Sequence, residues 1–332
     1  MPIRPFSFPS DFRIVEQLTP QAYHYPKETG WVTRGVQEQE VKNFVDSLRA
    51  AKGLWPLIAL GQILFPRLRN LLRGFIWEED GKPVGLVASG EGANRTWWIA
   101  NLAVLPTYRR RGVASHLVQA AIETAKSFDG ETMTLDVIAE NLPAYQLYQK
   151  FGFETYNGSV EFLAPNDPLP LMPIPREYLV RYLKADEWQP HFQIAQRVTP
   201  ADVQKFRPIT IERFRSSLIK RWMNRIVESA SGISRGGMAI YWRGNQEPCA
   251  SAQFTVRVRP GGVHELNVRF DPVHPGLAIY ILNAGISLLQ NAYPNHPTHI
   301  HVYSWQEPLV LAAQEIGCSK YHTYHTMGMN MK

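Results

Sequence analysis

Residues 97–153 contain a strand, a short basic turn and a helix, and this unit constrains the fold more than any other stretch. Residues 99–105 (IANLAVL) form an apolar run that is typical of a buried strand. The turn YRRRGVA follows at residues 108–114. After the turn, apolar residues recur at the spacing of one helix face, at Leu117, Val118, Ala121, Ile122 and Ala125. The pattern indicates a mixed α/β domain in which this helix packs on a sheet.

The turn is predicted to bind a diphosphate. The first amides of the following helix lack partners inside the helix, and the helix dipole makes that end positive. Arg109, Arg110 and Arg111 add full charges and fork-shaped donors that suit phosphate oxygens. A solvated run of surface charges is the alternative, but the position between a strand and an amphipathic helix favours the anion site. A dinucleotide-binding turn is a poor rival because two glycines of its fingerprint are absent.

The composition describes a globular protein with room for two domains. The chain has 332 residues, of which 45% are hydrophobic and 19% are charged. It carries 35 Lys and Arg against 29 Asp and Glu, a net charge of +6, and most of the basic residues are scattered. This mild excess suits an anionic small ligand. We find no motif that reads DNA or RNA, so nucleic acid is not expected as a partner.

Cysteine use and hydrophobic runs favour a cytoplasmic protein. Cys249 and Cys318 are the two cysteines, which indicates a reducing compartment without a disulfide framework. The N-terminus lacks the continuous apolar segment of a signal peptide. The longest apolar run, Leu54–Phe65, contains Pro56 and Gly61 and is shorter than the ~20 residues that span a bilayer. We therefore expect no stable membrane insertion, and interpret the run as a sheet-packed helix or lid, with membrane-surface contact as the alternative.

The periodicity of the first half predicts mixed strands and helices. The expected elements are a strand at Phe12–Pro20, helices at Val41–Leu48 and Leu54–Leu72, a hairpin of Gly74–Trp77 and Pro83–Ala88, strands at Thr96–Leu105 and Met133–Ala139 with a helix at 114–128 between them, a short helix capped by Asn141, and a strand at Phe153–Phe162. Closely spaced prolines from Pro165 to Pro175 predict an extended segment. Tyr178–Leu183 is interpreted as the last strand of a first domain.

The second half repeats this pattern. The matching segments are Phe192–Pro200 for the first strand, Met238–Trp242 and Pro248–Phe254 for the hairpin, His264–Phe270 for the strand before the turn, Gly276 for Gly112, and Trp305–Gly317 for the capped helix. Self-similarity at an offset of about 165–180 residues indicates two copies of one fold. We therefore divide the chain into an N-terminal domain at residues 1–183, a linker at 184–191 and a C-terminal domain at 192–332.

Two motifs resemble the signatures of a known family. Arg109-x-x-Gly112-x-Ala114 after an apolar strand resembles the Gln/Arg-x-x-Gly-x-Gly/Ala signature of the GNAT superfamily of N-acetyltransferases. Asn141-x-x-Ala144-x-x-Leu147-Tyr148-x-Lys150-x-Gly152-Phe153 resembles the second signature. The resemblance covers residues 75–160, and the tandem arrangement resembles that of mycothiol-synthase-like, double-GNAT proteins. It implies an α+β (mixed α/β) fold of two GNAT-like domains, each with a mixed, mostly antiparallel, splayed sheet flanked by helices.

The resemblance also implies acetyl-CoA as the cosubstrate and no metal. In GNAT proteins the strands that here end near Leu105 and Ala139 splay apart, and pantetheine bonds to main-chain groups in the gap, as an added strand would. The implied cosubstrate contacts are Leu102, Ala103, Val104, Arg109, Arg110, Arg111, Gly112, Val113, Ala114, Asn141 and Tyr148.

The implied reaction is direct attack of a primary amine on the thioester. It needs a donor for the oxyanion, for which the amide of Ala103 or Val104 is the candidate. It also needs an acid for the departing thiolate, and Tyr148 is the candidate. The reference pKa of a phenol (~10) lies above that of a thiol (~8.5), so Tyr148 is protonated near neutral pH and can transfer its proton as charge develops on the sulfur. Asp136 is the candidate base. It lies where the N-terminal-alanine acetyltransferases of ribosomal proteins carry an acidic residue.

Structural interpretations of these two residues stay open. Tyr148 could simply pack against the sheet as an aromatic helix residue. Asp136 could be a solvent-facing strand residue without a chemical role. Glu91, at the end of the hairpin, and Glu140 are rival bases that could act through water.

The second copy departs from both signatures. Residues 271–276 (DPVHPG) replace the arginine turn, where Pro275 removes an amide donor and Asp271 adds a negative charge near any phosphate. Ala313 stands in the place of Tyr148, and Gln306 in the place of Asn141. The C-terminal domain is therefore expected to be degenerate.

The sequence thus predicts a cytoplasmic, acetyl-CoA-dependent N-acetyltransferase whose partners are a CoA thioester and a primary amine on a small molecule or a peptide. The alternative is a non-catalytic acyl-CoA-binding module that acts through protein contacts of its degenerate second domain. Seven of the ten histidines lie between His264 and His325. Metal binding is the alternative there, but no third acidic or cysteine ligand has a helpful spacing, so they are interpreted as structural or surface histidines. The sequence leaves a homodimer open.

Overall fold

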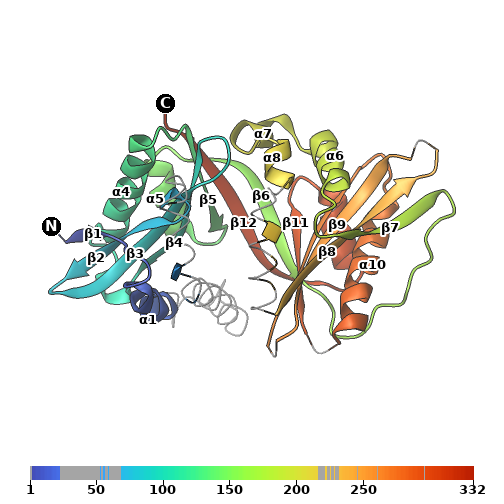
Figure 1. The fold of residues 1–332 in the computed structure, drawn as a ribbon, viewed down its shortest axis with the longest axis horizontal. Helices are drawn as coiled ribbons and strands as arrows, with labels where there is room; N and C mark the ends of the chain where they lie inside the picture. Colours follow the sequence, from blue (N-terminus) through green and yellow to red (C-terminus); the bar gives the residue numbers. More distant parts are fainter. Residues whose placement is uncertain are drawn as a thin grey trace. The chain divides into compact units, whose positions relative to one another are not determined.

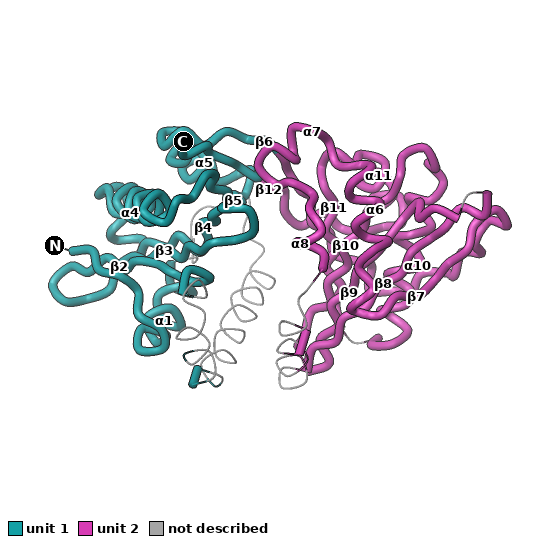
Figure 2. Tube along the Cα trace, turned by 45° about the horizontal axis from the view of Figure 1, so that its top comes forward, with its two compact units in different colours: residues 1–156, 325–332 teal, residues 157–324 magenta. Residues whose placement is uncertain are grey.

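The structure is a computed structural model that describes residues 2–22, 53, 55–56, 59, 69–215, 221–222, 225, 228, 232–244, 246–259, 261–294 and 296–332. The predicted helix at Val41–Leu48 and most of the one at Leu54–Leu72 lie outside these residues. The chain divides into two compact units, which Figure 2 colours separately: unit 1 is residues 1–156 with 325–332, and unit 2 is residues 157–324. No helix in the described part of the chain is long and apolar enough to cross a membrane.

Unit 1 is a mixed sheet with helices on both faces. Its elements are β1 (Ile3–Pro5), α1 (Phe12–Ala22), β2 (Arg73–Glu79), β3 (Lys82–Glu91), β4 (Thr96–Val104), the 3-10 turn η2 (Pro106–Tyr108), α4 (Val113–Ser127), β5 (Thr132–Ile138), α5 (Leu142–Lys150) and the end of β12 (Ser319–Asn330). The strand order is β1-β2-β3-β4-β5-β12, and β4 and β5 are parallel (Figure 1). Side chains of α4 and α5 share one hydrophobic core with the sheet, and those of α1 share another.

Unit 2 is built in the same way. Its elements are β6 (Glu154–Leu163, from residue 157 on), β7 (Tyr178–Lys184), α6 (Gln189–Val198), α7 (Ala201–Phe206), α8 (Ile211–Phe214), β8 (Ile233–Trp242), β9 (Pro248–Arg257), β10 (His264–Phe270), α10 (Leu277–Ala292), β11 (Thr298–Tyr303) and α11 (Glu307–Glu315). The strand order is β6-β11-β10-β9-β8-β7, with β10 and β11 parallel. The repeat and the mixed α/β fold class predicted from the sequence are confirmed.

The two copies exchange their last strands. The residues of β6 that belong to unit 2 pair with β11, from Ser159↔Tyr303 to Leu163↔His299. Conversely, residues 325–332 at the end of the chain belong to unit 1, where β12 neighbours β5. The compact units therefore do not coincide with the predicted segments 1–183 and 192–332. The interpretation of Tyr178–Leu183 as a last strand was wrong, because β7 pairs with β8 and begins the second sheet.

The strand predicted at Phe12–Pro20 is wrong as well, since this stretch forms α1. Its buried residues recur at helical spacing, at Phe12, Val15, Leu18 and Ala22. The same correction applies to Phe192–Pro200, most of which lies in α6, where His191, Ile194 and Ala195 are buried. The first three residues of each stretch alternate apolar, polar and apolar, as Phe12-Arg13-Ile14 and Phe192-Gln193-Ile194, so the strand and helix periods are not distinguished there. The prediction that these two stretches correspond within the repeat was correct, although both were predicted as strands and form helices.

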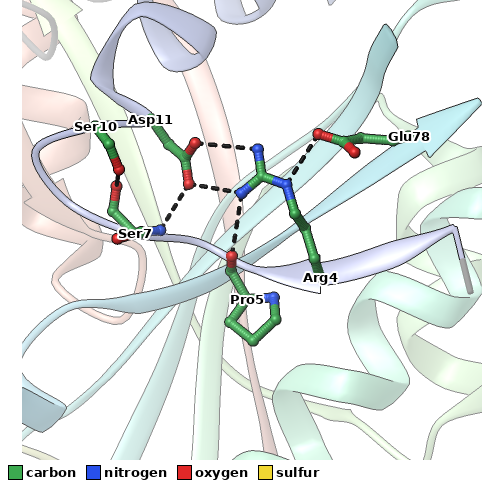
Figure 3. Close-up of polar contacts among 6 residues, drawn as sticks. All are labelled: Arg4, Pro5, Ser7, Ser10, Asp11 and Glu78. Carbon is green, nitrogen blue, oxygen red and sulfur yellow. Dashed lines mark hydrogen bonds and ion pairs between the residues drawn. The ribbon is translucent and has the colours of Figure 1, made fainter. Parts of the chain in front are cut away.

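An arginine clasp fixes the N-terminal strand. Arg4 donates to the Asp11 carboxylate over 2.7 and 3.0 Å, and its Nε donates to Glu78 of β2 over 2.9 Å (Figure 3). The amide of Ser7 donates to the same Asp11 carboxylate. Burial would raise the pKa of Asp11, but the bonds from Arg4 and Ser7 outweigh it and lower the pKa below its ordinary value. The clasp ties the start of α1 to β1 and β2.

Candidate active site

The turn between β4 and α4 presents a row of backbone amides. Arg110 and Gly112 adopt left-handed backbone conformations, with φ of 61° and 80°. Gly112 precedes the first residue of α4, and no side chain caps this helix. Within the described part of the chain, the amides of residues 110–115 donate to no acceptor. Alternating handedness in such a turn, followed by a helix N-terminus, points amides at one place and forms an anion-binding concavity.

The three arginines of the turn have different surroundings. The Arg109 side chain donates to the carbonyl of Ala22 at the end of α1 over 2.6 Å, and to that of Val104 at the end of β4 over 3.3 Å. Arg110 is exposed. Arg111 is also exposed, 3.7 Å from Glu79 and with its guanidinium 5.1 Å from the ring centroid of Tyr108. Arg109 therefore holds α1 to β4, and Arg110 and Arg111 carry the outward charge of the turn.

The strands β4 and β5 separate before this turn. They pair at three positions, from Thr96↔Thr132 to Trp98↔Thr134, and the described residues beyond these positions form no further pairs between the two strands. On its other side β4 stays paired with β3, as far as Gly85↔Val104, across a register shift near Asn101, whose φ is 50°. One edge of Leu102–Val104 is thus left without a strand partner, at the position where the family resemblance implies main-chain contacts.

Gly85 lets α4 approach the sheet beside this edge. A Cβ at Gly85 would lie 2.9 Å from Val113 and 3.2 Å from Leu117, and 3.3 Å from the carbonyl oxygen of Ala103. Val113 and Ala103 are both buried. The close packing places the start of α4 on β3 at Gly85, which pairs with Val104 at the end of β4.

Tyr148 lies on the α5 side of the sheet. It is 6% exposed, belongs to the core that contains Leu135 and Val137 of β5, and packs edge-on against Phe153 at 5.9 Å. Asn141 caps α5, because its side-chain oxygen accepts from the amide of Ala144 over 3.2 Å. The predicted capping role of Asn141 is confirmed.

Asp136 lies on the opposite face of β5. Burial alternates along this strand, with Met133, Leu135 and Val137 buried and Asp136 exposed, so the carboxylate faces away from the core of α4 and α5. Its Oδ1 accepts from the hydroxyl of Thr326 on β12 over 2.7 Å. Thr326 was not identified from the sequence, since it lies 190 residues away and has no motif around it.

The carboxylate of the rival base Glu91 accepts a hydrogen bond from a neighbouring side chain. Its Oε2 accepts from the side chain of the buried Asn70 over 3.0 Å, and Asn70 in turn accepts from Arg73. Glu140 is exposed, immediately before Asn141.

In the second copy, the amides of the corresponding turn are used by the chain itself. Those of His274, Leu277 and Ala278 donate to loop carbonyls, and that of Val273 donates to the Asp271 carboxylate. Gly276 has a φ of −64°, so the turn lacks the left-handed glycine of the first copy.

The charge of this turn is also reversed. Asp271 is buried and accepts from Arg197 of α6 over 2.6 Å, and Arg197 also donates to the carbonyl of Pro248. In the first copy an arginine of the turn reaches the first helix, whereas here an arginine of the first helix reaches the turn. A phosphate would meet the carboxylate of Asp271 instead of the exposed guanidinium groups of Arg110 and Arg111.

The strands β10 and β11 leave less open backbone than β4 and β5. They pair at four positions, from His264↔Thr298 to Asn267↔His301. Past this ladder, the buried side chain of Gln306 donates to the carbonyl of Phe270, the last residue of β10, over 2.7 Å. The side chain that replaces Asn141 thus fills the end of the strand gap.

Two histidines of unit 2, His264 and His296, have structural surroundings. Burial, together with nearby His296 and Arg257, lowers the pKa of His264 to about 4, so its ring is neutral and its Nδ1 accepts from the amide of Arg257. His296 stacks on His264 with ring centroids 5.0 Å apart. Among the described residues, no three His, Cys, Asp or Glu side chains are grouped so as to hold a metal ion.

Comparison with known proteins identifies the family of this chain. The sequence model of the Acetyltransferase (GNAT) family matches residues 45–153. The N-alpha-acetyltransferase of Sulfurisphaera tokodaii is 30% identical over 117 residues, which cover 30% of this chain and 68% of that protein. GCN5-related N-acetyltransferase 6, chloroplastic, of Arabidopsis thaliana is 41% identical over 64 residues, but the match covers 19% of this chain and 22% of that protein.

Solved structures resemble the chain over its whole length. A tandem GNAT protein from the clavulanic acid biosynthesis pathway aligns over 99% of this chain and 98% of its own, with a TM-score of 0.62 and 14% identity. A GCN5-related N-acetyltransferase from Sphaerobacter thermophilus aligns over 99% and 96%, with a TM-score of 0.64 and 12% identity. These identities establish the fold alone. Taken with the archaeal relative and the match at 45–153, they make this chain a member of the GNAT superfamily of acetyltransferases, with two GNAT-like domains.

Proposed function

We propose that the chain transfers an acetyl group from acetyl-CoA to a primary amine, and that the first copy carries the site. The observation that carries this proposal is the row of six amides at residues 110–115 without an acceptor, beside the outward charges of Arg110 and Arg111. Backbone donors with left-handed turn residues suit a diphosphate because they converge on its oxygens. The residues of the turn therefore fit the CoA diphosphate.

The thioester end of the cosubstrate would lie along the open edge of β4. Main-chain groups of Leu102, Ala103 and Val104 are the proposed contacts, because this edge lacks a strand partner among the described residues and can accept an added strand. The amide of Ala103 or Val104 would stabilise negative charge on the carbonyl oxygen during transfer. Asn141 would act mainly by capping α5, which carries Tyr148.

Tyr148 is the proposed acid and Asp136 the proposed base. The two lie on opposite faces of the sheet. The amine and the leaving thiol lie on opposite sides of the acyl carbon, so Asp136 would meet the amine and Tyr148 the thiol. Tyr148 is buried, so its hydroxyl is held in place, and Asp136 is exposed, so it can meet an acceptor from solvent. Glu91, which accepts from the side chain of Asn70, and Glu140 are the alternative bases.

The amine can belong to a small molecule or to a peptide. The archaeal relative is named an N-alpha-acetyltransferase, and the chain covers 68% of it, so peptide N-termini are included among the candidate acceptors. Loops determine acceptor choice in such folds, and they carry no transferable code.

The second copy is proposed not to bind CoA. Its turn amides are engaged, Asp271 reverses the charge, and Gln306 occupies the carbonyl at the end of β10. Its contribution to the first copy is the strand end at residues 325–332.

The test is release of free CoA thiol from acetyl-CoA over a panel of small amines, lysine-containing peptides and free peptide N-termini. Tyr148→Phe should lower kcat about 10- to 100-fold near neutral pH, because proton transfer by a positioned acid contributes at least that much. Its KM for acetyl-CoA should change little. If Tyr148→Phe keeps full turnover, the acid assignment fails. Tight CoA binding without turnover of any amine would favour the non-catalytic acyl-CoA-binding module.

A further inference from the structure

We propose that Thr326 of β12 is a positioning residue for Asp136, so that the last strand of the second copy completes the transfer site of the first. This inference rests on the proposed function, since it assigns to Asp136 the base of the acetyl transfer. It gives the second copy a part in catalysis that requires no cosubstrate of its own.

The hydrogen bond is built from an ordered donor and an exposed acceptor. Thr326 is 4% exposed, and its hydroxyl donates to Oδ1 of Asp136 over 2.7 Å. Asp136 is otherwise an exposed strand side chain that is free to change its rotamer. A donor fixed in the packed strand selects one orientation of the carboxylate, and Oδ2 is left to take the proton of an incoming amine.

The same strand end also supports the acid. Successive side chains of a strand point to opposite faces, so the neighbours of Thr326 face the other side of the sheet. Met327 and Met329 lie in the core that contains Tyr148, and His325 packs against Tyr145 of α5 with ring centroids 5.3 Å apart. One short segment thus contacts Asp136 on one face and packs in the core of Tyr148 on the other.

The chemistry explains why orientation matters at this point. The amine must lose a proton as its nitrogen bonds the acyl carbon and the carbon–sulfur bond breaks. That proton goes to Asp136, and the departing sulfur takes a proton from Tyr148. A carboxylate that leaves its orientation meets the amine proton less often, and small misplacement of a positioned group lowers rates by about one to two orders of magnitude.

Unit 2 carries a polar pair at the equivalent place, which is independent support. His301 of β11 and Glu161 of β6 face each other in register, with Nδ1 and Oε1 3.9 Å apart. The separations 301 − 136 and 326 − 161 are both 165 residues, so the two pairs correspond within the repeat. Asp136 of β5 and His301 of β11 thus each meet a polar residue on the last strand of the other copy, Thr326 of β12 or Glu161 of β6. The contact therefore occurs in both copies, because each sheet receives its last strand from the other copy.

The test uses four variants of the full chain: Thr326→Val, Thr326→Ser, Asp136→Asn and the double variant Asp136→Asn/Thr326→Val. Thr326→Val, which removes the hydroxyl at nearly constant volume, should lower kcat about tenfold or more and leave the KM for acetyl-CoA within about twofold. Thr326→Ser keeps the hydroxyl and should restore kcat to within about threefold of the wild-type value. In the Asp136→Asn background, Thr326→Val should cause no further loss.

Thr323→Val is the matched control. Thr323 lies on the same strand within unit 2, and its buried hydroxyl has no partner in the described residues, so this variant should keep wild-type turnover. Thermal unfolding of every variant separates loss of fold from loss of rate.

Three outcomes decide the proposal. Wild-type kcat in Thr326→Val would overturn it, and so would an equal further loss in the Asp136→Asn background, because the threonine would then act independently of Asp136. If the wild-type chain acetylates an amine and Thr326→Val does so equally well, this proposal fails and the proposed function stands. Absence of turnover with every amine in the wild-type chain would instead overturn the proposed function, and this inference with it.

Discussion

Arg109 and Arg111 lie two residues apart in the same motif, yet their side chains serve different ends. Arg109 points inward to the carbonyls of Ala22 and Val104, and Arg111 stays 57% exposed beside Glu79. The sequence predicts a basic turn between a strand and an amphipathic helix, and the structure has this turn between β4 and α4. Which arginine turns inward depends on where α1 ends, and no local pattern contains that information.

This difference predicts separable effects of two substitutions. Arg109→Ala should lower the free energy of unfolding by about 1.5–3 kcal/mol, because two bonds from a charged donor to backbone carbonyls are lost. Arg111→Ala should leave stability nearly unchanged and weaken CoA binding roughly two- to fivefold, as expected for an exposed charge. Urea unfolding and calorimetric titration with CoA measure the two effects. Raising the salt concentration should reduce the effect of Arg111→Ala on CoA binding. An Arg109→Ala variant with the free energy of unfolding of the wild-type chain would contradict the inward role of Arg109.

The clasp at Arg4 predicts a pH-dependent contribution to stability. Its partner Asp11 has a lowered pKa in the folded state, so it binds fewer protons there than in the unfolded chain at mildly acidic pH. The stabilisation is therefore complete above the unfolded pKa near ~4 and is lost as the pH falls through the lower folded value. Arg4→Met should reduce the free energy of unfolding by about 1–3 kcal/mol at pH 7 and by much less near pH 3. Chemical denaturation at the two pH values checks this, and an equal loss at both would rule out the ionic contribution.

At the scale of elements, α4 and α10 begin alike in sequence and differently in structure. Both follow a strand through a turn that contains a glycine, Gly112 or Gly276. The first has a φ of 80° and the second −64°, because the second turn is closed by bonds to His274 and Pro275 carbonyls. The substitutions in the second turn, Asp271 and Pro275, are visible in the sequence and predict the loss of donors. The hydrogen bonds to the His274 and Pro275 carbonyls could not be predicted from the sequence, because they depend on the path of the backbone through the turn.

Alanine at the two glycines should therefore have unequal effects. Gly112→Ala forces a left-handed conformation on a residue with a Cβ, which costs about 1–2 kcal/mol, and should weaken CoA binding as the turn relaxes. Gly276→Ala is the matched control. Its backbone is compatible with alanine, and no atom of the described residues beyond its chain neighbours lies within 4 Å of the new Cβ, so stability should change by less than about 1 kcal/mol. Parallel thermal melts and CoA titrations of the two variants provide the comparison. Equal effects at both positions would contradict the assigned conformations.

At the scale of the whole molecule, the exchange of last strands could not be predicted from the sequence. The repeat is detectable because each copy has the same order of apolar periods, and the structure confirms that order. For the same reason, β6 and β12 carry equivalent patterns, so either could complete either sheet. Contacts seen in the structure, such as Ser159↔Tyr303 and Asp136–Thr326, identify the partner of each strand. This ambiguity, together with the 190 residues between them, is why the contact of Thr326 with Asp136 was missed.

Two domains of one fold with one open turn predict a stoichiometry of one CoA per chain. Calorimetric titration of the full chain with CoA should give a single site, because the second turn already donates its amides to its own carbonyls and to Asp271. Gly112→Asp places a carboxylate in the first turn and should abolish this binding, while thermal unfolding reports whether the variant stays folded. Residual binding of CoA by a folded Gly112→Asp variant, or two sites in the wild-type chain, would assign a working turn to the second copy. The sulfhydryl-free analogue of CoA should behave in the same way, since the amides recognise the diphosphate and not the thiol.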